Sequence, residues 1–166
     1  TKWGVKTEVI DKDFETLANY KIAVSYSKMA EESGDITNYD KTIDKIESTA
    51  PNAVVPKHQE GLTYLWGHVL YKQEKFELAE PKFHTLIENF PNSLFVENAW
   101  YAIGQLNYKL QNYDQCRRAY KEVLDGFPNS DFKDDAQHLI AQSFLNEKNY
   151  EQAYPEFDKL ATDEFK

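Results

Sequence analysis

A six-residue segment occurs twice in the chain, and this repetition constrains the fold more than any other feature of the sequence. Phe90-Pro91-Asn92-Ser93-Leu94-Phe95 recurs as Phe127-Pro128-Asn129-Ser130-Asp131-Phe132, at an offset of 37 residues. The same offset aligns further residues of matched size, namely Gly67 with Gly104 and Ala141, Ala79 with Cys116 and Ala153, and Phe83 with Tyr120 and Phe157. Self-similarity at a fixed period of about 20–50 residues is typical of repeat proteins, so we expect stacked copies of one structural unit.

Each unit of the repeat is predicted to hold two helices. Between Pro91 and Pro128, apolar residues follow helical spacing, are interrupted at Gln111-Asn112, and resume as a second stripe from Tyr113. Applied to every unit, the pattern predicts helix pairs 57–73 with 76–89, 94–110 with 113–126, and 131–147 with 150–162. A weaker match further upstream predicts helices at 12–32 and 38–49.

Glycine, proline and small polar residues mark the expected ends of these helices. Gly126 stands where a helix C-cap is expected, and Pro128 prevents the helix from continuing. Asn129, Ser130 or Asp131 can then cap the next helix by accepting hydrogen bonds from its first N–H groups.

Two further prolines, Pro81 and Pro155, occupy the same place early in the second helix of their units. A proline is harmless in a helix only in the first turn, where its missing N–H would have had no partner. We therefore expect these helices to begin late, near Leu78 and Gln152, or to kink at the proline.

The repeat pattern also predicts how the helices pack. Small residues at the positions of Gly67 and Ala79 let the two helices of a unit approach closely, and the large residue at the position of Phe83 fills the space beside them. A lone helical hairpin cannot bury its apolar side, so the units must stack on one another. The predicted fold class is all-α, a solenoid of about four hairpins at 12–51, 57–91, 94–128 and 131–166, with an N-terminal extension at 1–11.

Composition and charge exclude several classes of function. The chain has 28 acidic against 19 basic residues and a formal net charge of −9, which is the wrong sign for binding nucleic acid. No apolar run approaches the roughly 18 residues of a membrane span. The four histidines form no His-x-x-His or His-x-x-x-His pair, and Cys116 falls on a predicted buried stripe, so we expect neither a metal site nor a catalytic residue, and no cofactor.

The best unit resembles the tetratricopeptide repeat (TPR) family. The resemblance is carried by Trp100, Ile103-Gly104, Tyr108, Tyr113, Cys116, Tyr120, Val123 and Pro128. It implies a right-handed superhelical solenoid and a non-enzymatic scaffold that binds partner proteins or peptides. The unit of 37 residues is longer than the usual ~34, and with the Phe-Pro-Asn-Ser-x-Phe junction it is similar to the bacterial extracytoplasmic branch, which includes the Tol-Pal accessory protein and the lipoprotein of the outer-membrane assembly machine. This narrower resemblance implies a location in the periplasm or at the cell surface.

In TPR solenoids the first helix of each pair lines a concave groove, and here that groove is rich in tyrosine. The positions that the resemblance assigns to it are Tyr64, His68, Tyr71, Lys72, Tyr101, Gln105, Tyr108, Lys109, His138 and Gln142. Tyrosine offers a broad apolar ring with a polar tip, which suits binding surfaces. The alternative is that some of these tyrosines pack between adjacent units.

The two ends of the sequence suggest a second function. Trp3, Val5, Val9 and Ile10 lie outside any convincing unit, and the last unit stops near Phe165 without a polar cap. Solenoid ends need a polar outer face. The alternative function is therefore a structural subunit whose N-terminal segment covers the last unit of the next copy, which would give a head-to-tail filament.

Overall fold

All elements in the computed structural model are helical across the residues that it describes, which are 2–53 and 55–163, with side chains for 12–53 and 55–161. The α-helices are α1 (Lys2–Ser33), α2 (Thr37–Thr49), α3 (Pro56–Lys72), α4 (Phe76–Asn89), α5 (Val96–Lys109), α6 (Tyr113–Gly126), α7 (Lys133–Asn146) and α8 (Tyr150–Asp163). A short 3-10 helix, η1 (Ala50–Asn52), follows α2. The predicted class, an all-α chain of helix-turn-helix repeats with four hairpins, is confirmed for these residues.

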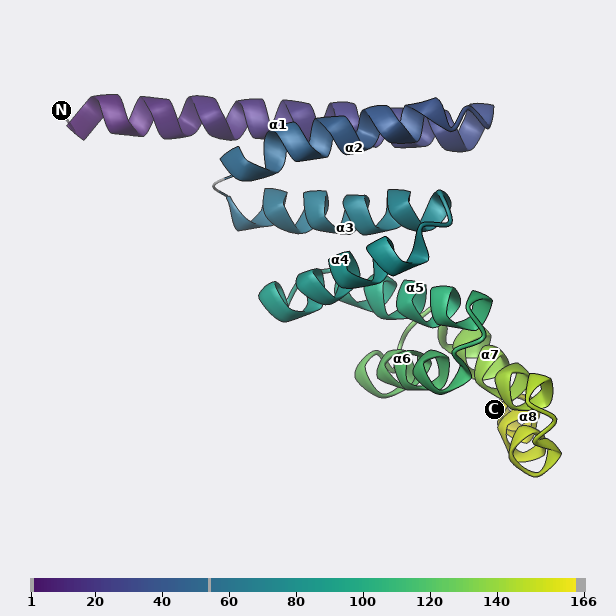
Figure 1. The fold of residues 1–166 in the computed structure, drawn as a ribbon. Helices are drawn as coiled ribbons and strands as arrows, with labels where there is room; N and C mark the ends of the chain where they lie inside the picture. Colours follow the sequence, from purple (N-terminus) through teal and green to yellow (C-terminus); the bar gives the residue numbers. More distant parts are fainter. Residues whose placement is uncertain (1, 54, 164–166) are drawn as a thin grey trace. The chain divides into compact units, whose positions relative to one another are not determined.

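The chain divides into two compact units, Thr1–Phe95 and Val96–Lys166. In the first unit, α2 folds back along the second half of α1, α3 packs against both, and α4 pairs with α3 (Figure 1). In the second unit, α5 pairs with α6, α7 packs on α6, and α8 pairs with α7. Each unit has its own apolar core, which centres on Ile46 and Val69 in the first and on Tyr120 and Ile140 in the second.

The helix boundaries agree with the sequence pattern to within two residues, with one exception. That exception is α1, which begins at Lys2, so the backbone of residues 2–11 continues the helix predicted at 12–32. No proline interrupts this stretch. The side chains of Trp3, Val5, Val9 and Ile10, and all of Phe165, lie outside the described residues.

A glycine and an aromatic ring hold the two helices of a hairpin together, as the repeat alignment predicts. A Cβ atom built on Gly67 of α3 would lie 2.8 Å from Cε1 of Phe83 in α4, and one on Gly104 of α5 would lie 2.5 Å from Cε1 of Tyr120 in α6. Both rings are fully buried. Since real Cβ atoms do not approach so closely, the hairpins can close to this distance only where the first helix lacks a side chain.

The prediction that α4 and α8 begin late is wrong. The two helices start at Phe76 and Tyr150, not near Leu78 and Gln152, and each contains its proline in the interior. A proline at such a position removes one hydrogen bond, to the carbonyl one turn earlier.

Packing of the first turn against the rest of the hairpin explains why α4 extends ahead of Pro81. The ring of Phe76 lies against Tyr71 of α3, with 5.7 Å between ring centroids, and Ala79 is fully buried. These contacts stabilise the turn more than one lost hydrogen bond, worth about 0.5–1.5 kcal/mol, destabilises it.

Left-handed backbone in the hairpin turns was not predicted from the sequence. Glu74, Gln111 and Lys148 have φ of 58°, 61° and 60° and occupy the same repeat position between the two helices of their hairpins. Gly126, in contrast, does not have a positive φ; it is the last residue of α6, and Phe127 takes the C-cap position with φ of −131°. The predicted glycine cap is therefore wrong, and the strained turns carry ordinary side chains.

We expect Gly104→Ala to destabilise the protein by about 1–3 kcal/mol, because the added methyl group meets the buried ring of Tyr120, which has no room to move. Chemical denaturation monitored by circular dichroism measures the change. The matched control is Gly126→Ala, where a Cβ meets nothing within 4 Å. The control should leave stability unchanged or raise it by up to ~1 kcal/mol, because alanine is the better helix former. Equal stability of the Gly104→Ala variant and the unmodified chain would contradict the close-packing account.

We expect Gln111→Gly to raise the free energy of unfolding by about 0.5–1 kcal/mol, because glycine adopts the left-handed conformation without steric strain. The same denaturation measurement applies. Glu122→Gly, at an exposed position inside α6, is the control and should lower stability by about 1 kcal/mol. A loss of stability at Gln111 comparable to that at Glu122 would show that the turn is not strained.

Candidate partner-binding face

The repeated six-residue segment forms a turn that places a phenylalanine ring on the first helix of the preceding hairpin. In the first copy, the Ser93 N–H donates to the Phe90 carbonyl over 2.9 Å, and the Phe95 N–H donates to Ser93 Oγ over 3.2 Å. The ring of Phe95 then stacks on Tyr64 of α3, with 4.8 Å between centroids and 11° between planes.

The second copy repeats this arrangement within the other unit. The Ser130 N–H donates to the Phe127 carbonyl over 2.9 Å, the Phe132 N–H donates to Ser130 Oγ over 3.0 Å, and Phe132 stacks on Tyr101 of α5 at 4.4 Å. The prediction that Asn129, Ser130 or Asp131 caps α7 is wrong in detail. Phe132 stands at the N-cap position, and its side chain makes no capping hydrogen bond to the first N–H groups of the helix. The serine instead fixes the turn just before the helix.

These stacks determine what the first two groove tyrosines can do. Tyr64 lies between Phe95 and the tilted ring of Phe83, and Tyr101 lies between Phe132 and Tyr120. Both side chains are half-buried. Burial, with smaller contributions from Glu31 and Tyr20, raises the pKa of Tyr64 above its ordinary value. The two tyrosines therefore pack between elements of their own unit and offer a partner only part of their surface.

In the first unit, two of the remaining predicted residues lie beside one carboxylate. His68 Nε2 lies 3.0 Å and Lys72 Nζ lies 3.8 Å from Oε1 of Glu31, which comes from the end of α1. Tyr71 is half-buried against Phe76. Glu31 was not predicted from the sequence as part of the face, because this exposed glutamate is distant in sequence from His68 and Lys72 and belongs to no repeat or motif.

In the second unit, a hydrogen bond joins the two first helices. The Asn146 amide of α7 donates to the hydroxyl of Tyr108 in α5 over 2.9 Å, and the Gln142 amide donates to Asn146 Oδ1 over 3.1 Å. Gln105 is half-buried, whereas Lys109 and His138 are exposed, and His138 makes an edge contact with Phe157. The structure thus brings Tyr108 and Gln142 together through Asn146.

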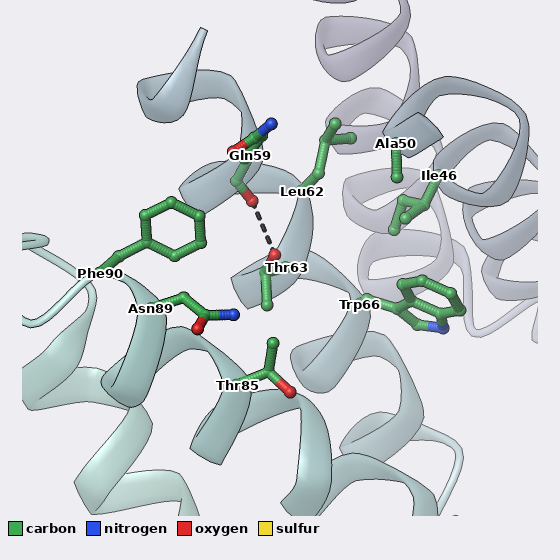
Figure 2. A pocket seen from close by; sticks show the side chains of 9 residues that line it. All are labelled: Ile46, Ala50, Gln59, Leu62, Thr63, Trp66, Thr85, Asn89 and Phe90. Carbon is green, nitrogen blue, oxygen red and sulfur yellow. Dashed lines mark hydrogen bonds between the residues drawn. The ribbon is translucent and has the colours of Figure 1, made fainter. Parts of the chain in front are cut away.

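The opposite side of α3 carries a small hollow in the first unit (Figure 2). Its volume is about 200 Å³, and its lining comprises Ile46, Ala50, Gln59, Leu62, Thr63, Trp66, Thr85, Asn89 and Phe90. Thr63, a small side chain, lines the hollow, and its repeat equivalents are the larger Trp100 and Gln137. Trp66 lines the hollow, and Lys82 Nζ lies over its ring at 3.4 Å from the ring centroid.

Three features bear on other kinds of chemistry. Within the described part of the chain, no three His, Cys, Asp or Glu side chains are grouped to hold a metal ion. The helices of that part also include none with the length and apolar character of a membrane span. Cys116 is fully buried in the second core, and this burial raises the pKa of its thiol to about 12, against a smaller opposing effect of Arg117.

We expect the Cys116 thiol to resist a thiol-specific reagent in the folded protein at mildly alkaline pH, because only the thiolate reacts and the raised pKa keeps the thiol protonated. Absorbance after addition of Ellman's reagent measures the reaction. The thiol should react fully once denaturant unfolds the chain, which serves as the control. Rapid reaction of the native protein would show that the thiol is not held in the core.

Comparisons with known proteins agree with this geometry. Residues 64–131 match the family described as Tetratricopeptide repeat. A search of curated proteins gave no match. Among solved structures, MamA from Desulfovibrio magneticus RS-1 resembles the chain with a TM-score of 0.64 at 15% identity, over 89% of this chain and 74% of that chain. MamA of AMB-1 resembles it with a TM-score of 0.62 at 17% identity, over 95% of this chain and 92% of that chain.

At such identities the structural likeness concerns the fold, and it does not distinguish among branches of the family. The family match spans the hairpin, the junction and the best unit that carry the sequence resemblance. Residues 64–131 thus match the tetratricopeptide-repeat family, and the chain resembles the all-helical fold of the MamA structures.

Proposed function

We propose that the chain is a non-enzymatic scaffold that binds partner proteins or peptides through the tyrosine-rich faces of its first helices. The tetratricopeptide-repeat segment supports this general function, since repeats of this kind form extended binding surfaces. The relevant faces are that of α3 in the first unit and that of α5 with α7 in the second.

The bond between Tyr108 and Asn146 is the observation that carries the proposal. It fixes an aromatic ring and an amide from two different helices beside Lys109 and Gln142 before any partner arrives. Binding is tighter when the side chains are already ordered, because less conformational entropy is lost on association. The face of α5 and α7 is thus preorganised for a polar segment of a partner.

The stacked tyrosines indicate which chemical groups of a partner the face can bind. At the positions where chaperone-binding members of the family carry a Lys/Asn clamp for a terminal carboxylate, this chain has Tyr64, Tyr101 and His138. Two of these are packed on phenylalanine rings. Recognition through aromatic rings and amides therefore fits the face better than capture of a C-terminal carboxylate.

We expect a photoreactive amino acid introduced at Gln105 or Lys109 to form adducts with a partner in native extracts. The same probe at Glu122, exposed on α6, is the control and should not form them. For the partner so identified, Tyr108→Ala should weaken binding at least about tenfold in calorimetry, because the ring and its bond to Asn146 are lost together. Lys121→Ala, exposed on α6, should leave the affinity unchanged.

Adducts of equal yield from both sides of the second unit would contradict the proposal, as would a Tyr108→Ala variant that binds as well as the unmodified chain. Far-ultraviolet circular dichroism of each variant checks that helicity is retained. Tyr71→Ala provides the matching test on the first unit.

We also propose that the chain acts outside the bacterial cytoplasm, in the periplasm or at the cell surface. The support is the likeness of its long unit and Phe-Pro-Asn-Ser-x-Phe junction to the extracytoplasmic branch of the family. Cell fractionation with an antibody to the chain distinguishes this location from the cytoplasm. The alternative function, head-to-tail self-assembly, uses other surfaces of the molecule, on α1 and α8.

A further inference from the structure

The helix α1 has two apolar faces, and only one of them is covered. Ala23 and Ala30 lie in the core of the first unit beside α2. At about 100° per residue, Ile22 and Met29 lie roughly a quarter to a third of a turn around the helix from these alanines and Phe14 lies opposite them, and the three are 67% (Phe14), 42% (Ile22) and 50% (Met29) exposed. A helix with apolar residues all round is normally buried on all sides.

The exposed face of α1 carries the same residues as the docking face of α7. Phe14, Ala18, Ile22 and Ser25 correspond to Phe132, Ala136, Ile140 and Ser143 at a constant offset of 118 residues. In α7 these residues dock on α6: Ala136 and Ile140 lie in the core with Tyr120, Ser143 is fully buried, and Phe132 stacks on Tyr101. The exposed side of α1 is therefore built like the surface by which a first helix packs on the second helix of a preceding hairpin.

The corresponding second helix with an open surface is α8. It is the repeat equivalent of α6, and Tyr154 stands where α6 has Arg117. Arg117 is 9% exposed beneath α7, whereas Tyr154 is 74% exposed. Phe95 stacks on Tyr64, and Phe132 stacks on Tyr101. His138 is the next repeat equivalent of these tyrosines, and within the described part of the chain no phenylalanine stacks on it in the same way.

A charged contact of the interior interface is replaced on both surfaces. Between α6 and α7, Arg117 Nη1 lies 2.6 Å from Glu147 Oε2. The equivalent of Arg117 on α8 is Tyr154, and the equivalent of Glu147 on α1 is Met29. Leaving either charge without its partner in a buried interface would be costly. Tyrosine and methionine instead suit each other, because a thioether packs favourably against an aromatic ring.

We propose that α8 of one copy is covered by α1 of a second copy, in the arrangement in which α7 covers α6 within each chain. Phe14 of the second copy stacks on His138, Ile22 packs against Phe157 and Leu160, and Met29 covers Tyr154. The two surfaces differ, so the contact is heterologous, and successive copies join head to tail. The interface uses neither Tyr71 nor Tyr108, and among the residues assigned to the groove it takes up only His138.

Complementary variants test this interface in sedimentation velocity and light scattering, from micromolar to millimolar concentration. The unmodified chain should increase in mass with concentration. Ile22→Glu and Tyr154→Glu should each stay at the mass of one chain, because each destroys one of the two surfaces. Mixed in equal amounts, the two variants should form a complex of twice the chain mass that grows no further, because each contributes its intact surface once.

Leu78→Glu is the control, since Leu78 is an exposed apolar residue on α4 that belongs to neither surface; it should assemble like the unmodified chain. Circular dichroism verifies folding, and Phe14→Glu replaces Ile22→Glu if that variant is unfolded. A chain that remains monomeric throughout overturns the proposal. Assembly of Tyr154→Glu alone, without a complex in the mixture, also overturns the proposal, because it would indicate a dimer through α1 of both copies. Assembly of both single variants overturns it as well.

Crosslinking tests the register of the contact. Ser143 Oγ lies 3.1 Å from Arg117 Nη1 in the interior interface, and their equivalents are Ser25 and Tyr154. A mixture of Ser25→Cys and Tyr154→Cys chains, treated with a short bis-maleimide, should give a covalent dimer, while buried Cys116 does not react. Glu47→Cys, exposed on α2, replaces Ser25→Cys as control. Equal yields with Ser25→Cys and Glu47→Cys would overturn the proposed arrangement.

Discussion

The contact between a glycine on one helix and a buried aromatic ring on the next determines how each of the two central hairpins closes. The methyl group that alanine would add to Gly67 or Gly104 has no space, because the rings of Phe83 and Tyr120 already occupy it. The close approach buries the ring completely. The stacks of Phe95 on Tyr64 and of Phe132 on Tyr101 depend on this spacing, since the same tyrosines also touch Phe83 and Tyr120.

Most of the fold could be predicted because its determinants recur at one offset. The position of Gly104 and the aromatic residue that faces it follow from the repeat alignment alone, and so do the helix boundaries. The left-handed turns could not be predicted, since Glu74, Gln111 and Lys148 are not residues that favour a positive φ. The proline argument gave a later start for α4 than the repeat pattern, and the burial of Ala79 favours the start that the repeat pattern predicts.

The candidate face was less predictable than the fold, because its character depends on contacts between distant residues. The sequence placed Tyr64 and Tyr108 in one class, but a ring stack occupies the first and a hydrogen bond from Asn146 orients the second. Glu31 joins the face from α1 with no signal in its surroundings. Sequence alone also did not reveal that α1 is equivalent to α7, because the correspondence becomes evident only when the buried and exposed sides of α1 are known.

The hollow beside Trp66 has a consequence for measurement. The indole borders the empty space on one side and carries the ammonium group of Lys82 on its face, so its emission responds to whatever alters either neighbour. The other described tryptophan, Trp100, occupies in its own hairpin the repeat position of Thr63. The emission of Trp66 therefore gives an optical signal that changes when the hollow is occupied or when Lys82 is displaced.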